Sequence, residues 1–245
     1  MDISIIIPAF NESQKIGRDV EAAASFFSET GLEGEVIVVD DGSSDDTAEV
    51  ARQAKIPSPL KRIILRLEKN SGKGASVKRG VLESKGKVVL YADSGTCIPY
   101  ANALPVIRKI MAGELDLGLG SRRLRETVIL RNRTLRRRII SWVFHQAAIF
   151  VAGLPRWISD SQCGFKVYKG NIARELFAGL VTSGFLFELE IILKALRRGL
   201  RIEEFPVEWT CDLDSRLRPA AQAKNVLKEL LEIRAMMKSP GFLKF

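Results

Sequence analysis

Charged side chains follow three short apolar runs of the chain and lie where they could bind a ligand. Asp93 ends one such run, the adjacent pair Asp40 and Asp41 ends another, and Lys73 lies in a glycine-flanked turn after a third. Two adjacent acids exceed what capping the next helix needs, so we expect at least one of them to contact a ligand. A lysine in such a turn before a helix attracts an anion. The sequence therefore predicts a binding site for a ligand with an anionic group.

The composition argues against several other kinds of site. His145 is the only histidine, which leaves too little material for a His/Cys zinc site or a Ser-His-Asp triad. The cysteines Cys97, Cys163 and Cys211 follow no metal-ligand spacing and fit a reducing cytoplasm. The Lys73 turn lacks the spacing of a Walker loop, so an ATP-binding P-loop is not expected. The chain opens without a basic segment or long apolar run, so no secretion signal is expected.

Apolar runs alternate with helical segments along the first hundred residues, as in an α/β fold. The continuous run Ile3–Ile7 is typical of a central parallel strand that is buried on both faces. Further strands are predicted at residues 35–39, 62–67, 88–91, 116–120 and 201–209. In such a sheet, ligands bind beyond the carboxyl ends of the strands, where Asp93 is expected. With 245 residues, the chain is long enough for one doubly wound α/β domain.

The positive charge is concentrated in one segment. The formal net charge is +9, and residues 121–138 contain eight arginines and one acid, Glu126. This indicates an anionic partner, and without a basic-aromatic RNA motif we do not expect nucleic acid. The following segment Ile139–Leu154 is apolar nearly all round but shorter than a membrane span. It is either a buried core helix or an interfacial helix on anionic lipid.

The order of several motifs resembles a known enzyme family. The segments IIIPAFNE, VVDDGSSDDT, NSGKGASVKRG and LYADSG look like the nucleotide-sugar half of inverting family 2 glycosyltransferases of GT-A fold, with a Rossmann-like, mostly parallel sheet and helices on both faces. The later segments DSQCGFKVY, LFELEIIL and PVEW resemble dolichyl- or polyprenyl-phosphate glucose and mannose synthases, closest to the glucosyl branch. The resemblance implies a single domain over residues 1–245, with a nucleotide-sugar half at about 1–120 and an acceptor half at about 121–245.

The resemblance also implies roles for individual residues. Those implied around the nucleoside and the donor are Pro8, Ala9, Asn11, Glu12, Asp40, Asp41, Lys73 and Gly74. Those implied at the lipid phosphate are Arg122, Arg137 and Ser141. Those implied in the later site motifs are Asp160, Gln162, Lys166, Glu190 and Arg216, with Gln162 and Arg216 toward the donor and Glu190 catalytic. Asp93 corresponds to the first acid of a metal motif for Mg²⁺ or Mn²⁺, whose second acid is replaced by Gly95.

The activity that the resemblance implies is transfer of a hexose, with inversion, from UDP-glucose or GDP-mannose to a polyprenyl or dolichyl phosphate. A phosphate monoester is largely dianionic at pH 7 and needs no general base. The protein would lie on the cytoplasmic face of a membrane and contact it through residues 122–154. One alternative is a soluble transferase with a hydroxyl acceptor, which would need Glu188, Glu190 or Asp160 as a base. Another is a non-catalytic protein that binds a nucleotide sugar, and the oligomeric state stays open.

Overall fold

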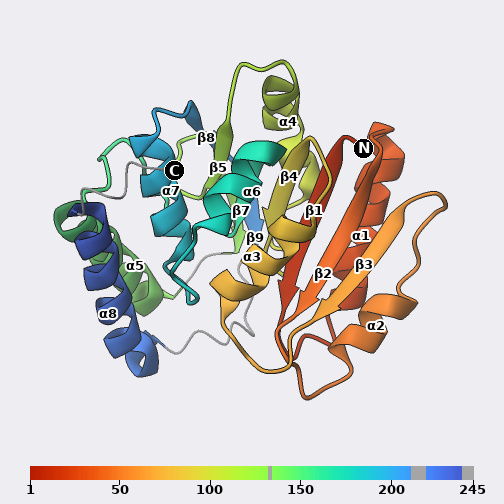
Figure 1. Ribbon diagram of the computed structural model, residues 1–245, viewed down its shortest axis with the longest axis horizontal. Helices are drawn as coiled ribbons and strands as arrows, with labels where there is room; N and C mark the ends of the chain where they lie inside the picture. Colours follow the sequence, from red (N-terminus) through yellow and green to blue (C-terminus); the bar gives the residue numbers. More distant parts are fainter. Residues whose placement is uncertain (132–133, 211–218, 239–245) are drawn as a thin grey trace.

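The computed structural model describes residues 1–131, 134–210 and 219–238, apart from the side chains of 136–137 and 219–224. Its centre is a seven-stranded sheet (Figure 1). The strands, in spatial order, are β3 (Lys61–Arg66), β2 (Gly34–Asp40), β1 (Ile3–Ala9), β4 (Val88–Ala92), β7 (Phe165–Lys169), β5 (Leu117–Ser121) and β8 (Ile202–Pro206). A two-stranded sheet pairs β6 (Val128–Arg131) with β9 (Glu208–Thr210). All pairings of the large sheet are parallel except those of β7. The predicted fold class is confirmed.

Helices cover both faces of the sheet, and each face has its own hydrophobic core. The helices are α1 (Ile16–Thr30), α2 (Thr47–Gln53), α3 (Lys73–Glu83), α4 (Leu104–Met111), α5 (Leu135–Ala147), α6 (Gly170–Ala178), α7 (Phe187–Arg197) and α8 (Pro219–Lys238). In β1, Ile5 and Ile7 pack with α1 and α4, whereas Ile6 packs on the face that α3, α6 and α7 cover. A strand that is covered by helices on both faces of the sheet has apolar side chains on both sides, which explains the continuous apolar runs in the sequence.

Two features of the sheet differ from the prediction. Strand β7 was not predicted, and it lies antiparallel between β4 and β5. The strand predicted at 201–209 is two strands: β8 pairs with β5, and β9 leaves the large sheet to pair with β6. The division falls after Pro206, which has no N–H group to donate to a strand ladder. The small sheet of β6 and β9 follows from this division.

The apolar segment 139–154 is helical, and its two faces differ. α5 continues into a π-helical turn, Ala148–Ala152, and ends at Gly153 in the left-handed conformation. Ala148 and Leu154 are buried in the core, whereas Trp142 and Phe150 are 59% and 71% exposed. The segment is therefore a core helix along one face and exposed along the other. No helix in the part of the chain that the structure describes is long and apolar enough to cross a membrane.

Candidate active site

The carboxyl ends of β1 and β2 lie side by side and hold the first predicted residues together. Pro8 and Ala9 end β1, and the Ala9 carbonyl accepts a hydrogen bond from the Asp41 N–H at 2.8 Å. Asp40 is fully buried at the end of β2, where its Oδ1 accepts the Ser43 N–H at 2.9 Å. Its Oδ2 lies 3.4 Å from the Arg66 guanidinium but has no hydrogen-bond partner among the described residues. Asp40 is therefore a buried carboxylate that lies between a backbone N–H group and an arginine at the carboxyl end of β2.

Hydrogen bonds join the turn after β1 to the turn after β2. Asn11 has a left-handed backbone, with φ at 52°, donates its N–H to Ser43 Oγ at 2.8 Å and accepts the Ser44 N–H at 2.7 Å. The Glu12 N–H donates to Thr47 Oγ1 at 2.8 Å. Positive φ is uncommon outside glycine, and asparagine tolerates it best. The two turns therefore form one rigid rim beside Asp40.

Asp41 holds the lysine turn in place. Its two carboxylate oxygens accept the N–H groups of Ser71 and Gly72 at 2.7 and 3.0 Å. A Cβ on Gly74 would lie 2.6 Å from the Thr182 carbonyl oxygen, so only glycine fits the packing of α3 on that segment. Asp41 thereby positions Lys73, the first residue of α3, beside the end of β4.

Asp93 and Lys73 form an ion pair at the end of β4. Lys73 Nζ lies 2.8 Å from Oδ1 and 3.0 Å from Oδ2 of Asp93, and the Tyr91 hydroxyl donates to Oδ1 at 2.5 Å. Burial disfavours the ammonium, but the charges of Asp93 and Glu188 outweigh it and raise the pKa of Lys73. Burial, followed by the charge of Asp93, raises the pKa of Tyr91 well above its ordinary value. The lysine is therefore a fixed cation and the tyrosine a hydrogen-bond donor.

Helix α7 brings one of its two glutamates to this ion pair. Glu188 Oε1 is 3.8 Å from Lys73 Nζ, and its Oε2 is 3.3 Å from Lys166 Nζ. Lys166 is a fully buried residue of β7. Glu190 points elsewhere, because its carboxylate accepts the N–H groups of Val181 and Thr182 and pairs with Lys194. The structure thus brings Glu188 to Asp93 and does not bring Glu190 there.

The loop after Asp93 is hydrogen-bonded to Asp19, a buried carboxylate of α1. Asp19 is 1% exposed, accepts the Ser94 hydroxyl at 2.6 Å, and accepts the Gly95 N–H at 2.9 and 3.0 Å. Burial raises the pKa of Asp19 despite these hydrogen bonds. On the other side, a Cβ on Gly164 would lie only 2.0 Å from Asp93 Oδ2. We call Asp40, Asp41, Lys73, Asp93 and Glu188 the carboxyl-edge site.

Arg122 forms a second buried ion pair next to the first. Its Nε and Nη2 donate to the two oxygens of Asp160 at 2.7 and 2.8 Å, and Nη2 also donates to the Gln162 carbonyl at 2.7 Å. The charge of Asp160 outweighs the effect of burial and raises the pKa of Arg122. The side-chain Nε2 of Gln162 is buried without a hydrogen-bond partner among the described residues. Arg122 and Gln162 are therefore packed together.

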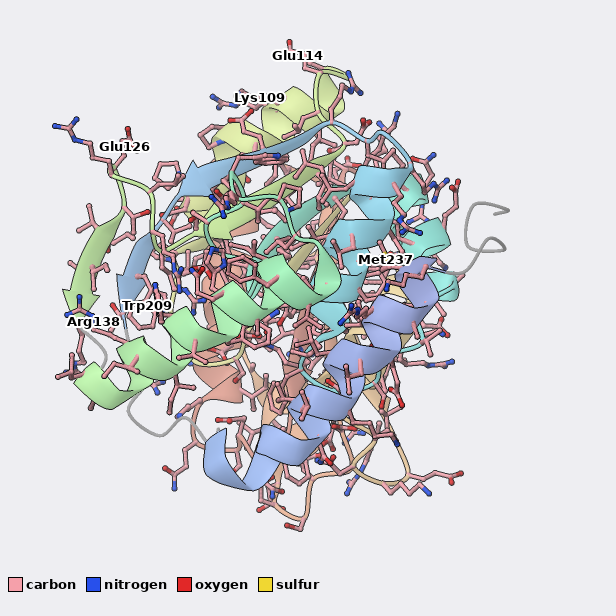
Figure 2. The ribbon with its side chains drawn as sticks, turned by 90° about the vertical axis from the view of Figure 1, so that its left-hand side faces the viewer. Lys109, Glu114, Glu126, Arg138, Trp209 and Met237 are labelled. Atoms are coloured by element: carbon pink, nitrogen blue, oxygen red, sulfur yellow. The ribbon has the colours of Figure 1, made fainter. Side chains whose placement is uncertain are left out.

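A pocket of about 530 Å³ opens beside α5. We call it the α5 pocket; its lining residues are Arg122, Arg123, Ile129, Leu135, Arg138, Ile139, Ser141, Trp142, Asp160 and Trp209. Figure 2 shows Arg138 near the start of α5, close to Trp209 of β9. The Arg123 Nη2 donates to the carbonyl and hydroxyl oxygens of Ser141, each at 3.2 Å. The pocket combines guanidinium groups with aromatic and aliphatic surface.

Two predicted residues lie outside what the structure describes. The backbone of Arg137 is part of α5, but its side chain is not described, and Arg216 falls in the undescribed range 211–218. Of the other predicted residues, Arg122 and Ser141 meet at the α5 pocket, and Asp40, Asp41, Lys73 and Asp93 meet at the carboxyl-edge site. The two sites adjoin through residues 162–164, because Arg122 donates to the Gln162 carbonyl and the Asp93 N–H donates to the Gly164 carbonyl at 2.8 Å.

The described residues do not form a complete set of ligands for a divalent metal ion. They include no group of three or more His, Cys, Asp or Glu side chains that could hold a metal ion. Both oxygens of Asp93 already contact the Lys73 ammonium. Gly95, at the position of the motif's second acid, has no side chain to offer, and its N–H is bonded to Asp19. Magnesium usually takes one or two carboxylates together with substrate phosphates.

A family model decides the class of this chain. The model for "Glycosyl transferase family 2" matches residues 4–177, which include the whole carboxyl-edge site except Glu188. The chain belongs to glycosyl transferase family 2. The resemblance found in the sequence motifs is confirmed.

Among curated proteins, this family 2 chain is similar to dolichyl-phosphate beta-glucosyltransferases. It is 32% identical to that of Dictyostelium discoideum, over 95% of this chain and 73% of the relative. It is also 32% identical to that of Saccharomyces cerevisiae, over 95% of this chain and 74% of the relative. A solved structure of glucosyl-3-phosphoglycerate synthase from Mycobacterium tuberculosis, in complex with Mn²⁺, UDP and glucosyl-3-phosphoglycerate, has a TM-score of 0.70 at 20% identity. It covers 98% of this chain and 82% of the other, and it shows the same fold.

The structure adds residues that the motifs did not single out. Asp19 belongs to an amphipathic helix, in which an acid is expected on the solvent-exposed face. No pattern in the sequence predicts its contact with Ser94. Arg123 and Arg138 belong to the arginine-rich segment, and only the pocket distinguishes them from its other arginines. The position of Gly164 in the motif DSQCG suggests a role in the site. The reason that glycine is required is seen only in the structure, where Asp93 lies against it.

Proposed function

We propose that this chain transfers a hexose, glucose first among the candidates, from a nucleotide sugar to a polyprenyl or dolichyl monophosphate with inversion at the anomeric carbon. The α5 pocket carries this proposal. Its arginines Arg122, Arg123 and Arg138 suit a phosphate, and its apolar residues, such as Leu135 and Trp142, suit a hydrocarbon chain. A lipid phosphate has both parts. The similarity to dolichyl-phosphate beta-glucosyltransferases supports the same acceptor and favours UDP-glucose over GDP-mannose as donor.

The reaction joins the two neighbouring sites. A phosphate oxygen of the acceptor attacks the anomeric carbon, the bond from that carbon to the nucleoside diphosphate breaks, and the diphosphate leaves with the electron pair. The acceptor is largely dianionic at pH 7, so no side chain has to remove a proton. Arg122 and the α5 pocket hold the nucleophile, and Lys73 lies where the leaving diphosphate gains charge. Catalysis then consists of orientation and charge stabilisation.

The nucleoside is proposed to bind at the ends of β1 and β2. The base would lie at the end of β2 beside Asp40 and Arg66, where Asn11 and Glu12 form the rigid rim. Asp41 acts through the lysine turn that it holds. We assign the carboxylate role on α7 to Glu188, which contacts Lys73, in place of Glu190, which holds backbone N–H groups. The role of Arg216 stays a prediction.

The protein is proposed to bind the membrane surface through the exposed side of residues 122–154. Exposed apolar residues cluster on β6 and α5; those that are more than half exposed are Val128, Leu130, Leu135, Ile139, Trp142, Val143 and Phe150. Arginines 122, 123 and 138 lie among them at the α5 pocket. Apolar side chains among cations bind anionic lipid surfaces reversibly. The cytoplasmic face is the side we expect.

The test is transfer of radiolabel from UDP-glucose, with GDP-mannose in parallel, to polyprenyl phosphate in detergent. We expect labelled lipid from UDP-glucose. Polyprenol without the phosphate is the matched acceptor control, because it keeps the hydrocarbon and lacks the anion. Transfer to a soluble hydroxyl acceptor, with none to the lipid phosphate, would contradict the proposal. Binding of the nucleotide sugar without any transfer would indicate a binding protein.

A further inference from the structure

We infer that Lys73 supplies, from within the chain, the positive charge that a divalent ion would otherwise bring to Asp93, so that the nucleotide sugar binds and reacts without a metal ion. This inference rests on the proposed function only for the identity of the donor. It concerns the diphosphate end of the donor, where the leaving group must be neutralised. The prediction of Mg²⁺ or Mn²⁺ at Asp93 came from the motif resemblance, and the geometry around Asp93 points the other way.

The first support is the position of the ammonium. Lys73 Nζ is 2.8 and 3.0 Å from the two oxygens of Asp93, so it faces the edge of the carboxylate on which a bound cation would lie. The Tyr91 hydroxyl takes a further lone pair of Oδ1 at 2.5 Å. A metal ion that bound both oxygens of this carboxylate would have to displace the ammonium. Asp93 is therefore a counter-ion for Lys73.

The second support is how firmly the lysine is held. Its Nζ is also 3.8 Å from Glu188, and it lies 5.5 and 6.0 Å from the ring centroids of Tyr91 and Phe187. Its side chain remains 21% exposed, so a phosphate oxygen can still reach it. Two carboxylates and two aromatic faces fix a cation without enclosing it. This is the arrangement expected for a group that must meet an incoming anion.

The third support is the loop that replaces the metal motif. Gly95 has φ at +107° and Thr96 at +46°, and Asp19 holds Ser94 and Gly95 from below. An aspartate at position 95 would have to adopt a backbone conformation that side-chain-bearing residues rarely adopt. The loop therefore has a backbone conformation that disfavours an acid at position 95, and Asp19 of α1 stabilises that conformation.

The charges around Lys73 agree with this reading. Lys73 pairs with Asp93 and Glu188, and Lys166 pairs with Glu188, at distances of 2.8 to 3.8 Å. These two cations and two anions balance each other. A divalent ion added to the group would lie near the ammonium groups of Lys73 and Lys166, whereas a diphosphate can share Lys73 with Asp93. The site is prepared for an anion.

The test measures nucleotide binding, which needs no acceptor. UDP affinity is determined by calorimetry in EDTA, in Mg²⁺ and in Mn²⁺, and Mn²⁺ binding is followed by its paramagnetic resonance signal with and without UDP. We expect the wild-type affinity for UDP in EDTA to stay within about threefold of that with either metal. The expected loss for Lys73→Gln in EDTA is about tenfold or more, the effect of removing a hydrogen bond to a charged group. Lys73→Arg should keep most of the affinity.

Lys78→Gln is the matched control, because Lys78 lies on the same helix and bonds the Leu180 carbonyl, away from Asp93. It should bind UDP like the wild type. UDP binding that requires Mn²⁺ in the wild type, with protein-bound Mn²⁺ in the resonance spectrum, would overturn the inference. So would unchanged affinity in a folded Lys73→Gln variant. Failure of transfer to lipid phosphate would leave this result untouched, so the two proposals fail separately.

Discussion

At the carboxyl-edge site the functional groups are buried or half-buried and already bonded to one another, whereas in the α5 pocket many lie open to solvent. Asp40 and Asp41 are at most 5% exposed, and each accepts backbone N–H groups. Leu135 and Trp142, on the wall of the pocket, are 69% and 59% exposed. The two regions adjoin through residues 162–164, yet they are built on different principles.

The difference follows from what each region is proposed to bind. A nucleotide sugar is small and polar, so its recognition needs donors and acceptors that are fixed before it arrives. A lipid phosphate is presented by a membrane, and the apolar side chains that meet it gain a partner only there. Rigid hydrogen-bonded turns serve the first task. An exposed helix face with a cationic pocket serves the second.

Substitution at the carboxyl-edge site is expected to have the largest effect. Asp93→Asn keeps the shape of the side chain but removes the charge that holds Lys73. We expect transfer to fall by about two to three orders of magnitude, the range seen when a transition-state charge contact is lost. The assay is radiolabel transfer at saturating donor and acceptor. Asp2→Asn, at a surface ion pair with Lys87, is the control, and near-wild-type turnover of Asp93→Asn would remove Asp93 from the mechanism.

Arg122 tests the boundary between the two regions. Arg122→Lys keeps the positive charge but cannot reproduce both bonds to Asp160, and lysine lacks the planar fork that suits phosphate. We expect KM for the lipid phosphate to rise by about tenfold, with KM for the donor changed far less. The pair is buried, so a loss of about 1–3 kcal/mol in the free energy of unfolding is also expected. Equal changes in the two KM values would assign Arg122 to structure alone.

The exposed apolar residues should matter only in the presence of a membrane. Leu135→Ser combined with Trp142→Ser is expected to weaken binding to anionic vesicles by about tenfold, through the loss of buried apolar area. Surface substitutions usually change stability by less than about 0.5 kcal/mol, so thermal unfolding should be almost unchanged. Leu82→Ser, at another exposed apolar residue on α3, is the control in cosedimentation. Equal vesicle binding by both variants would place the membrane contact elsewhere.

The sequence predicted the parallel core of the sheet because buried parallel strands are continuous apolar runs bounded by turns. It missed β7 for a physical reason. Phe165–Lys169 carries two lysines among its five residues, and its Lys166 is fully buried, which is almost never seen unless a carboxylate pairs with it. That carboxylate, Glu188, comes from a helix about twenty residues later. No local pattern reports such a long-range pair.

The candidate site shows the same limit. The order of motifs was sufficient to place Asp40, Asp41, Lys73 and Asp93 at one edge, and the structure brings them there. Glu188 and Glu190 are two residues apart on a helix and therefore point in different directions, but this spacing does not decide which one faces Lys73. That choice depends on how α7 packs on the sheet. Tertiary packing, rather than residue type, determines which of two equivalent acids is used.

An ion pair remote from both regions gives the smallest expected effect and a scale for the others. Asp116 accepts hydrogen bonds from the Arg201 side chain at 2.8 and 2.9 Å, and these, despite partial burial, hold its pKa below the ordinary value of 3.8. A carboxyl whose pKa is lower in the folded than in the unfolded state stabilises the fold above its unfolded pKa. That contribution is lost as the pH falls through the folded pKa. Arg201 is half exposed, so solvent screening keeps the effect small.

Asp116→Asn should therefore lower the unfolding midpoint by no more than about 3 °C at pH 7, and the difference from wild type should vanish in the acid range below pH 3.8. Thermal unfolding followed by circular dichroism between pH 2 and 7 measures both quantities. Transfer activity at pH 7 should be unchanged, because the pair touches neither the carboxyl-edge site nor the α5 pocket. A large activity loss in this variant would mean that distant ion pairs also set the geometry of Lys73. The contrast between a rigid donor region and an open acceptor region would then extend to the whole sheet.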